Sequence, residues 1–135
     1  MIEINNLTNF AVDKKFFVAV AKKVLKGENR MKENISVAFV SPAEIKKLNR
    51  KYRGKNKPTD VLAFGEDYQS PIPNPQLNSF SEVVICPAVV KKDGEELEKM
   101  LIHGILHILG YEHEKSKRMA LEMEKKQEKY LSKIK

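Results

Sequence analysis

Short runs of β-branched and apolar residues alternate along the chain with longer segments in which apolar residues recur at helical spacing. The short runs have the length and composition of strands and predict them at residues 2–8, 35–40, 61–64 and 82–86. The longer segments predict helices at residues 14–25, 42–52, 93–110 and 115–133, with a short helix near 87–91. Because strands and helices alternate in so short a chain, the pattern predicts one domain over residues 1–135, of the α+β or α/β class, with a single sheet.

Residues with strong capping preferences mark several of these boundaries. Asp13 is the expected N-cap of the first helix, and Gly27 is the expected residue just past its end. Residues 41–44, Ser-Pro-Ala-Glu, combine an N-cap serine with proline and glutamate in the first turn, which is a strong helix start. Residues 66–79 contain three prolines and two asparagines and predict a loop or mobile flap.

The composition is that of a globular protein in a reducing compartment. Hydrophobic residues make up 41% of the chain and charged residues 32%, so the chain has enough apolar surface for a core. Cys86 is the single cysteine, so no disulfide can form within the chain. No apolar run approaches the length of a membrane span, about 20 residues, and the first ten residues lack the pattern of a secretory signal. We therefore expect a soluble, cytoplasmic protein.

The chain is basic, with 25 Lys and Arg against 18 Asp and Glu and a net charge of +7. Such a balance favours anionic partners, nucleic acid among them. Residues 46–59, KKLNRKYRGKNKPT, hold seven basic residues and no acidic one. This run is either a solvated helix end and loop or a surface that binds a nucleic-acid backbone. From residue 115 onward basic and acidic residues interleave, which indicates a solvated helix face.

All histidines of the chain lie within eleven residues, as His103, His107 and His113. The first two are four residues apart, so on a helix they share one face and can bind the same ion. Gly110 can adopt the left-handed conformation that ends a helix, and His113 then follows on the returning chain. A lone histidine in an apolar helix is usually a core residue bonded to a carbonyl. The third histidine beyond the glycine favours a metal site instead.

The surrounding residues narrow the kind of metal site. Residues 100–109 are apolar on nearly every side, which predicts a buried central helix. A closed structural zinc site needs four protein ligands, but the only thiol, Cys86, ends a predicted strand. We therefore expect zinc on three imidazoles with an open position for water. The spacing also matches the metzincin proteases, but Gly104 stands where those enzymes carry a glutamate base, which disfavours peptide hydrolysis.

Two segments within residues 35–115 carry a recognisable signature. Residues 48–64 contain Leu-Asn-x-x-Tyr-Arg-Gly followed by Pro-Thr-Asp-Val-Leu-x-Phe, and residues 103–113 read His-Gly-x-Leu-His-x-x-Gly-Tyr-x-His. Together they resemble the YbeY family of bacterial metal-dependent endoribonucleases, which act in ribosomal RNA maturation. The chain departs from the family pattern in three places: at Ala63, at residues 81–83 and at Glu112 the family has Ser, Gly-Asp-Ile and Asp.

The resemblance implies a zinc ion bound by His103, His107 and His113, with Arg53 as the functional arginine of the cleft. It also implies an α+β fold with a mixed, mostly parallel sheet, one antiparallel edge strand, covering helices and a buried, zincin-like metal-binding helix. The residues around Arg53 support this role independently of the resemblance, because Arg53 follows a helix end and can present its guanidinium to a phosphate. The alternative is that Arg53 is a surface arginine without a functional role. Asp60 either anchors a turn or holds a ligand histidine through a hydrogen bond that its carboxylate accepts, without touching the metal.

These observations predict a metal-dependent single-strand endoribonuclease that acts in ribosomal RNA maturation and ribosome quality control. Its expected partners are single-stranded ribosomal RNA and the small ribosomal subunit, with no DNA and no membrane. A small cleft suits a single strand better than a stacked duplex. The general base is left open, with Glu112 a weak candidate. Two other functions stay open: a ribosome-associated RNA-binding or assembly factor with a structural metal, and a metal-dependent hydrolase of another substrate.

Overall fold

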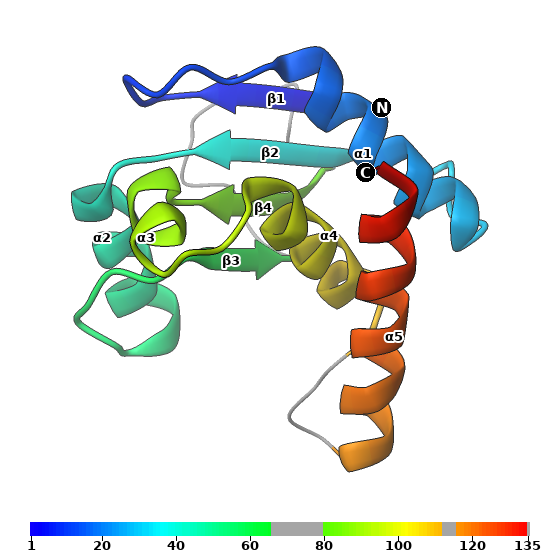
Figure 1. Ribbon diagram of the computed structural model, residues 1–135. Helices are drawn as coiled ribbons and strands as arrows, with labels where there is room; N and C mark the ends of the chain where they lie inside the picture. Colours follow the sequence, from blue (N-terminus) through cyan, green and yellow to red (C-terminus); the bar gives the residue numbers. More distant parts are fainter. Residues whose placement is uncertain (66–79, 112–115, 135) are drawn as a thin grey trace.

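The computed structural model describes residues 1–65, 80–111 and 116–134 (Figure 1). Within these ranges the chain forms four strands, which are β1 Ile2–Asn6, β2 Ile35–Phe39, β3 Val61–Phe64 and β4 Ser81–Ile85. The same ranges hold five helices, which are α1 Lys14–Gly27, α2 Pro42–Arg53, α3 Pro87–Lys92, α4 Leu97–Ile108 and α5 Lys117–Ile134. The predicted alternation of strands and helices is confirmed, and these elements form a single-domain α+β fold.

The strands form one mixed sheet in the order β1-β2-β4-β3. β1 pairs with β2, and β2 with β4, in parallel, so Ile4, Val37 and Val83 lie side by side across the sheet. β3 pairs with β4 in the antiparallel direction at one edge of the sheet, and in Figure 1 its arrow points opposite to the others. The expected mostly parallel sheet with one antiparallel edge strand is therefore confirmed.

Helices cover both faces of the sheet, because alternate residues of its central strands point to opposite sides. Val37 and Val83 belong to the larger core cluster, which they share with α1, α4 and α5. Their neighbours Ala38 and Val84 belong to a smaller cluster with α2. All five residues of both β2 and β4 are buried. This packing places α4 directly against β4 and the edge strand β3.

Helix α4 is shorter than the helix predicted for residues 93–110. It begins at Leu97, because Gly94 has a φ of +71° and turns the chain after α3. The predicted burial is confirmed on most of its surface, whereas His103 and His107 are only half-buried. The buried residues of the helix are Met100, Leu101, Ile102, Gly104, Ile105 and Leu106.

The end of α1 also differs from the prediction. Gly27 is the last helical residue, and the positive φ beyond the helix belongs to Asn29, at +58°. A Cβ at position 27 would collide with the ring of Tyr130 in α5. The glycine therefore allows two helices to approach closely and does not itself end α1. The start of the helix is as predicted, because Asp13 accepts a hydrogen bond from the Phe16 N–H at 3.2 Å.

The capping signals predicted for α2 are confirmed. Ser41 accepts a hydrogen bond from the Glu44 N–H at 3.2 Å, and proline occupies the first turn. Gly54 closes the helix with a φ of +69° in the left-handed region. The final residue of α2 is therefore Arg53, which the capping glycine holds at the helix end.

Two predicted features lie outside the described residues. They are the loop or flap at residues 66–79 and the segment 112–115, which contains Glu112 and His113. Among the helices that the structure describes, none combines the length and the apolar surface needed to cross a membrane.

Candidate functional site

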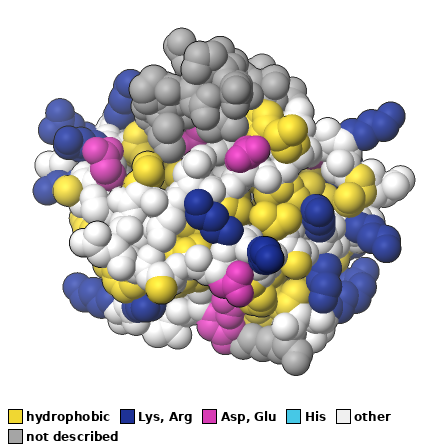
Figure 2. Space-filling view, turned by 90° about the horizontal axis from the view of Figure 1, so that it is seen from above, with side chains coloured by type: hydrophobic (Ala, Val, Ile, Leu, Met, Phe, Trp, Pro, Cys, Tyr) yellow, Lys and Arg dark blue, Asp and Glu magenta, His cyan; other side chains and the backbone are white. Residues whose placement is uncertain are grey.

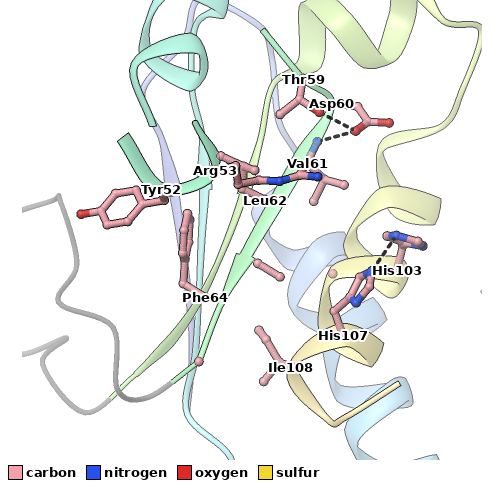
Figure 3. Close-up of a pocket in the computed structure, with 13 residues that line it drawn as sticks. Tyr52, Arg53, Thr59, Asp60, Val61, Leu62, Phe64, His103, His107 and Ile108 are labelled. Atoms are coloured by element: carbon pink, nitrogen blue, oxygen red, sulfur yellow. Dashed lines mark hydrogen bonds between the residues drawn. The ribbon is translucent and has the colours of Figure 1, made fainter. Parts of the chain in front are cut away.

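A cavity of about 830 Å³ lies between the end of α2, the edge strand β3 and α4 (Figure 3). Residues of both sequence motifs line it, the first motif from α2 through β3 and the second from α4. Two segments about fifty residues apart in the chain thus form opposite walls of one site. The lining residues are Tyr52, Arg53, Thr59, Asp60, Val61, Leu62, Ala63, Phe64, Gly65, His103, Gly104, His107 and Ile108.

The two histidines of α4 approach each other closely at this cavity. Their Nε2 atoms are 3.1 Å apart, and their ring planes are inclined at 78°. A tetrahedral zinc ion with Zn–N bonds of about 2.0–2.1 Å holds two ligand nitrogens about 3.3–3.4 Å apart. His103 and His107 therefore have the donor type and the spacing to chelate one ion with little movement.

The second ring nitrogen of His103 points to another helix. Its Nδ1 lies 2.9 Å from Oε1 of Gln127 in α5. An amide oxygen only accepts hydrogen bonds, so Nδ1 is the donor. This contact orients the ring of His103 with Nε2 towards His107.

The third predicted ligand, His113, lies outside the described residues. In the part of the chain that is described, no three His, Cys, Asp or Glu side chains form a group that could hold a metal ion. The chain is described as far as Tyr111, and Gly110 has the positive φ, +105°, that is predicted for the end of the helix. The described residues supply two of the three predicted zinc ligands, and the complete three-histidine site stays a prediction.

Tyr111, two residues before His113, is bound to Glu28 at the end of α1. The carboxylate accepts hydrogen bonds from Tyr111 at 2.6 Å and from Tyr130, and it pairs with Lys126 at 3.2 Å. Burial alone would raise the pKa of Glu28, but these donors together hold it below its ordinary value. The bond to Glu28, together with burial, raises the pKa of Tyr111 to about 12. Glu28 thus ties the chain just after α4 to α1 and α5.

Arg53 lies at the cavity on the side opposite the histidines. It is the last residue of α2, and it is exposed. Figure 3 shows its side chain extending from α2 over β3, beside Val61. The neighbouring Tyr52 packs its ring against Phe64 of β3, with ring centroids 5.2 Å apart. This contact attaches the end of α2 to the edge strand and so positions Arg53 at the cavity.

The basic run of residues 46–59 is displayed on α2 and the loop that follows. Its seven Lys and Arg side chains are exposed. Asn49 is buried and fastens the loop to the helix, because its Nδ2 donates to the Lys57 carbonyl at 2.9 Å. On the face over β1 that Figure 2 shows, Lys and Arg side chains are separated by hydrophobic ones. Compared with that face, the basic surface beside the cavity is denser, and it is our candidate for binding an anionic partner.

The position of Asp60 supports the turn interpretation. Its Oδ1 accepts hydrogen bonds from the Val61 N–H at 2.7 Å and from Thr59 Oγ1 at 3.3 Å. Its carbonyl accepts from the Cys86 N–H at 2.9 Å, which joins this turn to the end of β4. Asp60 therefore anchors the start of β3. The other role predicted for Asp60 is to hold a ligand histidine by its second ring nitrogen. At His103 that nitrogen, Nδ1, is bound by Gln127 instead.

The sequence pattern gives no signal for Gln127. It lies 24 residues after His103, in a helix whose interleaved charges predict a solvated face. Its role depends on α5 packing against α4, which is a tertiary contact. A spacing rule within one helix or one turn cannot identify such a residue.

Comparison with known proteins shows relatives over nearly the whole chain. A family model described as "Endoribonuclease YbeY" matches residues 3–135. A protein of that name from Bdellovibrio bacteriovorus is 42% identical over 110 residues, which cover 76% of this chain and 67% of the relative. Another from Persephonella marina is 38% identical over 118 residues, covering 82% of this chain and 76% of the relative.

A solved structure has a similar fold. It is a solution structure of a protein from Thermotoga maritima, with a TM-score of 0.64 and 31% sequence identity. The match covers 99% of this chain and 89% of that protein. The α+β arrangement described above is therefore found in an experimentally determined relative.

Proposed function

The chain belongs to the Endoribonuclease YbeY family, and on this premise we propose that it cleaves single-stranded ribosomal RNA in the cavity between α2, β3 and α4. Its family makes it an RNA-cleaving hydrolase with a role in ribosomal RNA maturation. The proposal adds the residues, the metal and the form of the substrate. One observation supports it most: Arg53 and the imidazoles of His103 and His107 line the same cavity.

The groups on the two walls have complementary chemistry for a phosphodiester. The guanidinium of Arg53 can bind two phosphate oxygens at once, and it keeps its charge throughout the reaction. The imidazoles suit a divalent transition metal, and zinc is our choice because nitrogen donors at tetrahedral spacing favour it. Such an ion would supply a Lewis acid beside the phosphate. His113 completes the ligand set in this proposal.

The residues around the cavity also suit an unpaired strand. Tyr52 and Phe64 line it together with Arg53, and aromatic rings beside a basic surface are typical of sites that accept unstacked bases. The exposed basic residues of α2 and its loop extend from the same wall and can follow the RNA backbone. A base-paired duplex keeps its bases stacked and presents a stiffer backbone to such a cavity.

Peptide hydrolysis fits the site less well. The helix position that carries the general base in metzincin proteases is Gly104, which is buried against the sheet. An RNA-binding assembly factor would use the same arginine and basic loop, but it would need no cleavage. Catalysis, rather than binding, is therefore the property that separates the proposal from this alternative.

A cleavage assay with purified protein tests the proposal directly. A labelled single-stranded RNA and its pre-formed duplex are each incubated with the protein, with chelator, and with chelator followed by zinc. We expect cleavage of the single strand, loss of cleavage in chelator and recovery on adding zinc. Full cleavage in chelator would overturn the metal part. RNA binding without cleavage under every metal condition would favour the assembly factor.

The same proposal places the protein in the cytoplasm with the small ribosomal subunit as its partner. The single buried thiol is consistent with a reducing compartment, and the net charge of +7 favours an RNA-rich partner. Sedimentation of the protein with purified small and large subunits at moderate salt checks this. We expect it to sediment with the small subunit, and equal sedimentation with both would contradict the assignment.

A further inference from the structure

Gln127 connects helix α5 to the candidate metal centre. Its Oε1 lies 2.9 Å from Nδ1 of His103, and both side chains are half-buried. The contact spans two helices, and it lies on the side of the His103 ring away from His107. Gln127 belongs to neither of the two sequence motifs.

The chemistry of the pair selects one tautomer of His103. An amide oxygen has no proton to donate, so the bond requires a proton on Nδ1 of the imidazole. In a neutral ring the lone pair then resides on Nε2. That atom is the one 3.1 Å from Nε2 of His107, where an ion would be chelated. The hydrogen bond therefore gives His103 the protonation pattern that a metal ligand needs before any metal arrives.

Gln127 is itself held in place by its neighbours on α5. Met123, one turn earlier, is 2% exposed, and Tyr130, three residues later, is 1% exposed. Residues at this spacing share one helix face, so the burial of Met123 and Tyr130 fixes the face of α5 that carries Gln127. Tyr130 also donates a hydrogen bond to Glu28 of α1. The amide is therefore presented from a packed helix.

We propose that Gln127 is a positioning residue that fixes the tautomer and ring orientation of His103 for metal binding. The inference rests on the proposed function, because it requires that His103 binds a metal. Groups that hold the second nitrogen of a ligand histidine commonly change metal affinity about 10–100-fold when removed. Gln127 acts through His103 and touches neither the metal nor the RNA.

Three variants test the proposal. Gln127→Met keeps the length of the side chain but removes the acceptor, whereas Gln127→Glu keeps an acceptor and strengthens it. Glu124→Met is the matched control, because Glu124 is an exposed residue of the same helix. Circular dichroism and thermal unfolding of the metal-free chains establish that each variant is folded.

Two measurements are made on each folded variant. Long-range ¹H–¹⁵N NMR on the metal-free chain reports which ring nitrogen of His103 carries the proton. Competition with a chromogenic chelator reports zinc affinity. We expect wild type, Gln127→Glu and Glu124→Met to keep the Nδ1–H tautomer and affinities within a few-fold of each other. Gln127→Met should lose the tautomer preference and bind zinc about 10–100-fold more weakly.

The outcomes separate this inference from the proposed function. If wild type binds zinc and Gln127→Met binds it equally well with the same tautomer, the inference is overturned and the metal site stands. If wild type binds no divalent transition metal, the metal proposal fails and the inference fails with it. Weaker zinc binding in Glu124→Met to the same degree would also overturn it, since the effect would then come from α5 as a whole.

Discussion

Gly104 of α4 lies so close to Val83 of β4 that a Cβ built on the glycine would be 2.6 Å from Cγ1 of the valine. Val83 is fully buried on a strand paired on both sides, so it has little room to retreat. The missing side chain lets α4 rest on the sheet while its histidines face the cavity. A glutamate base at this position does not fit the packing, which gives a structural reason for the departure from the protease pattern.

Replacing Gly104 by alanine should destabilise the fold. Alanine favours a helix over glycine by about 1 kcal/mol, but forcing a methyl group into a filled core costs about 1–3 kcal/mol. The distance to Val83 lies well inside normal contact, so we expect the packing cost to prevail. Urea unfolding measures the change. Adding Val83→Ala as a second substitution makes room for the methyl, so the double variant should be more stable than the two separate losses would give. A Gly104→Ala chain as stable as wild type would contradict the close contact.

Much of the fold could be predicted because its signals are local. The β-branched runs give the central strands, which are buried on both faces, and Ser41 with Glu44 gives the start of α2. The direction of the edge strand came from the family resemblance, since alternation of apolar residues does not distinguish parallel from antiparallel pairing. The resemblance likewise implied that Arg53 and the histidines belong to one site, and in the structure Arg53, His103 and His107 line the same cavity.

The predictions that failed involve glycines with more than one use. Gly27 was expected to end α1, but it makes space for Tyr130, and Asn29 takes the positive φ. Gly94 was expected near the start of a helix, but it turns the chain between α3 and α4. A single sequence does not show whether a glycine serves a turn or a close approach. Gln127 was missed for a related reason, because only tertiary packing brings it to His103.

Arg53→Ala should keep the fold and the metal but lose RNA cleavage. A guanidinium has no lone pair for a metal, and Arg53 is exposed at the end of α2. Removing one charged donor from a developing oxyanion costs about 3 kcal/mol, or roughly a hundredfold in rate. Arg53→Lys should recover part of this, because lysine keeps the charge and loses the paired donors. Initial rates on single-stranded RNA provide the measurement.

Arg50→Ala is the matched control for Arg53. Arg50 is exposed on the same helix, one turn earlier, and it is not among the residues that line the cavity. Its removal should change the rate less than a few-fold. Equal losses in the two alanine variants would mean that Arg53 contributes only to the general positive charge of α2.

Neutralising the basic loop should weaken RNA binding and its dependence on salt. Lys51, Lys55 and Lys57 are exposed beside the cavity, and changing them together to glutamine removes three candidate ion pairs with phosphate. Each ion pair removed should lower the slope of log K against log salt by roughly 0.7 for a single strand. Fluorescence anisotropy at several salt concentrations measures the slope.

The same change at three exposed lysines of α1 (Lys14, Lys15 and Lys22) is the control and should leave more of the slope intact. Identical slopes in wild type and the loop variant would leave the run a solvated surface.

His107→Ala should remove metal and stability together. Its Nε2 is 3.1 Å from that of His103, so the variant loses one of the two proposed ligands that lie within the described residues. A metal at a concentration of about 100 times its dissociation constant stabilises a fold by about 2.7 kcal/mol. We therefore expect the variant to unfold well below wild type in zinc and much closer to it in chelator, with elemental analysis showing less than one ion per chain. The same difference in both conditions would assign the loss to packing and count against a metal at His107.

Glu28→Gln should destabilise the protein in a way that depends on pH. The side chain of Glu28 is 8% exposed and accepts hydrogen bonds from Tyr111, Tyr130 and Lys126, so its charged form stabilises the fold by about 1–3 kcal/mol more than an amide would there. Because its pKa is held below the ordinary value in the folded state, this stabilisation is present above about pH 4.5 and is lost as pH falls through the folded value. Urea unfolding from pH 7 to pH 3 should therefore show the two proteins converging in acid. On the alkaline side, the pKa of Tyr111 is raised to about 12 in the folded state, so the stabilisation from this hydrogen bond is present below about pH 10 and is lost as pH rises towards 12, where the two proteins should again converge. Glu124→Gln, an exposed carboxylate on α5, is the control and should follow wild type throughout. A constant difference between wild type and Glu28→Gln across the acid range would show that the charge of Glu28 is not what holds Tyr111 to α1.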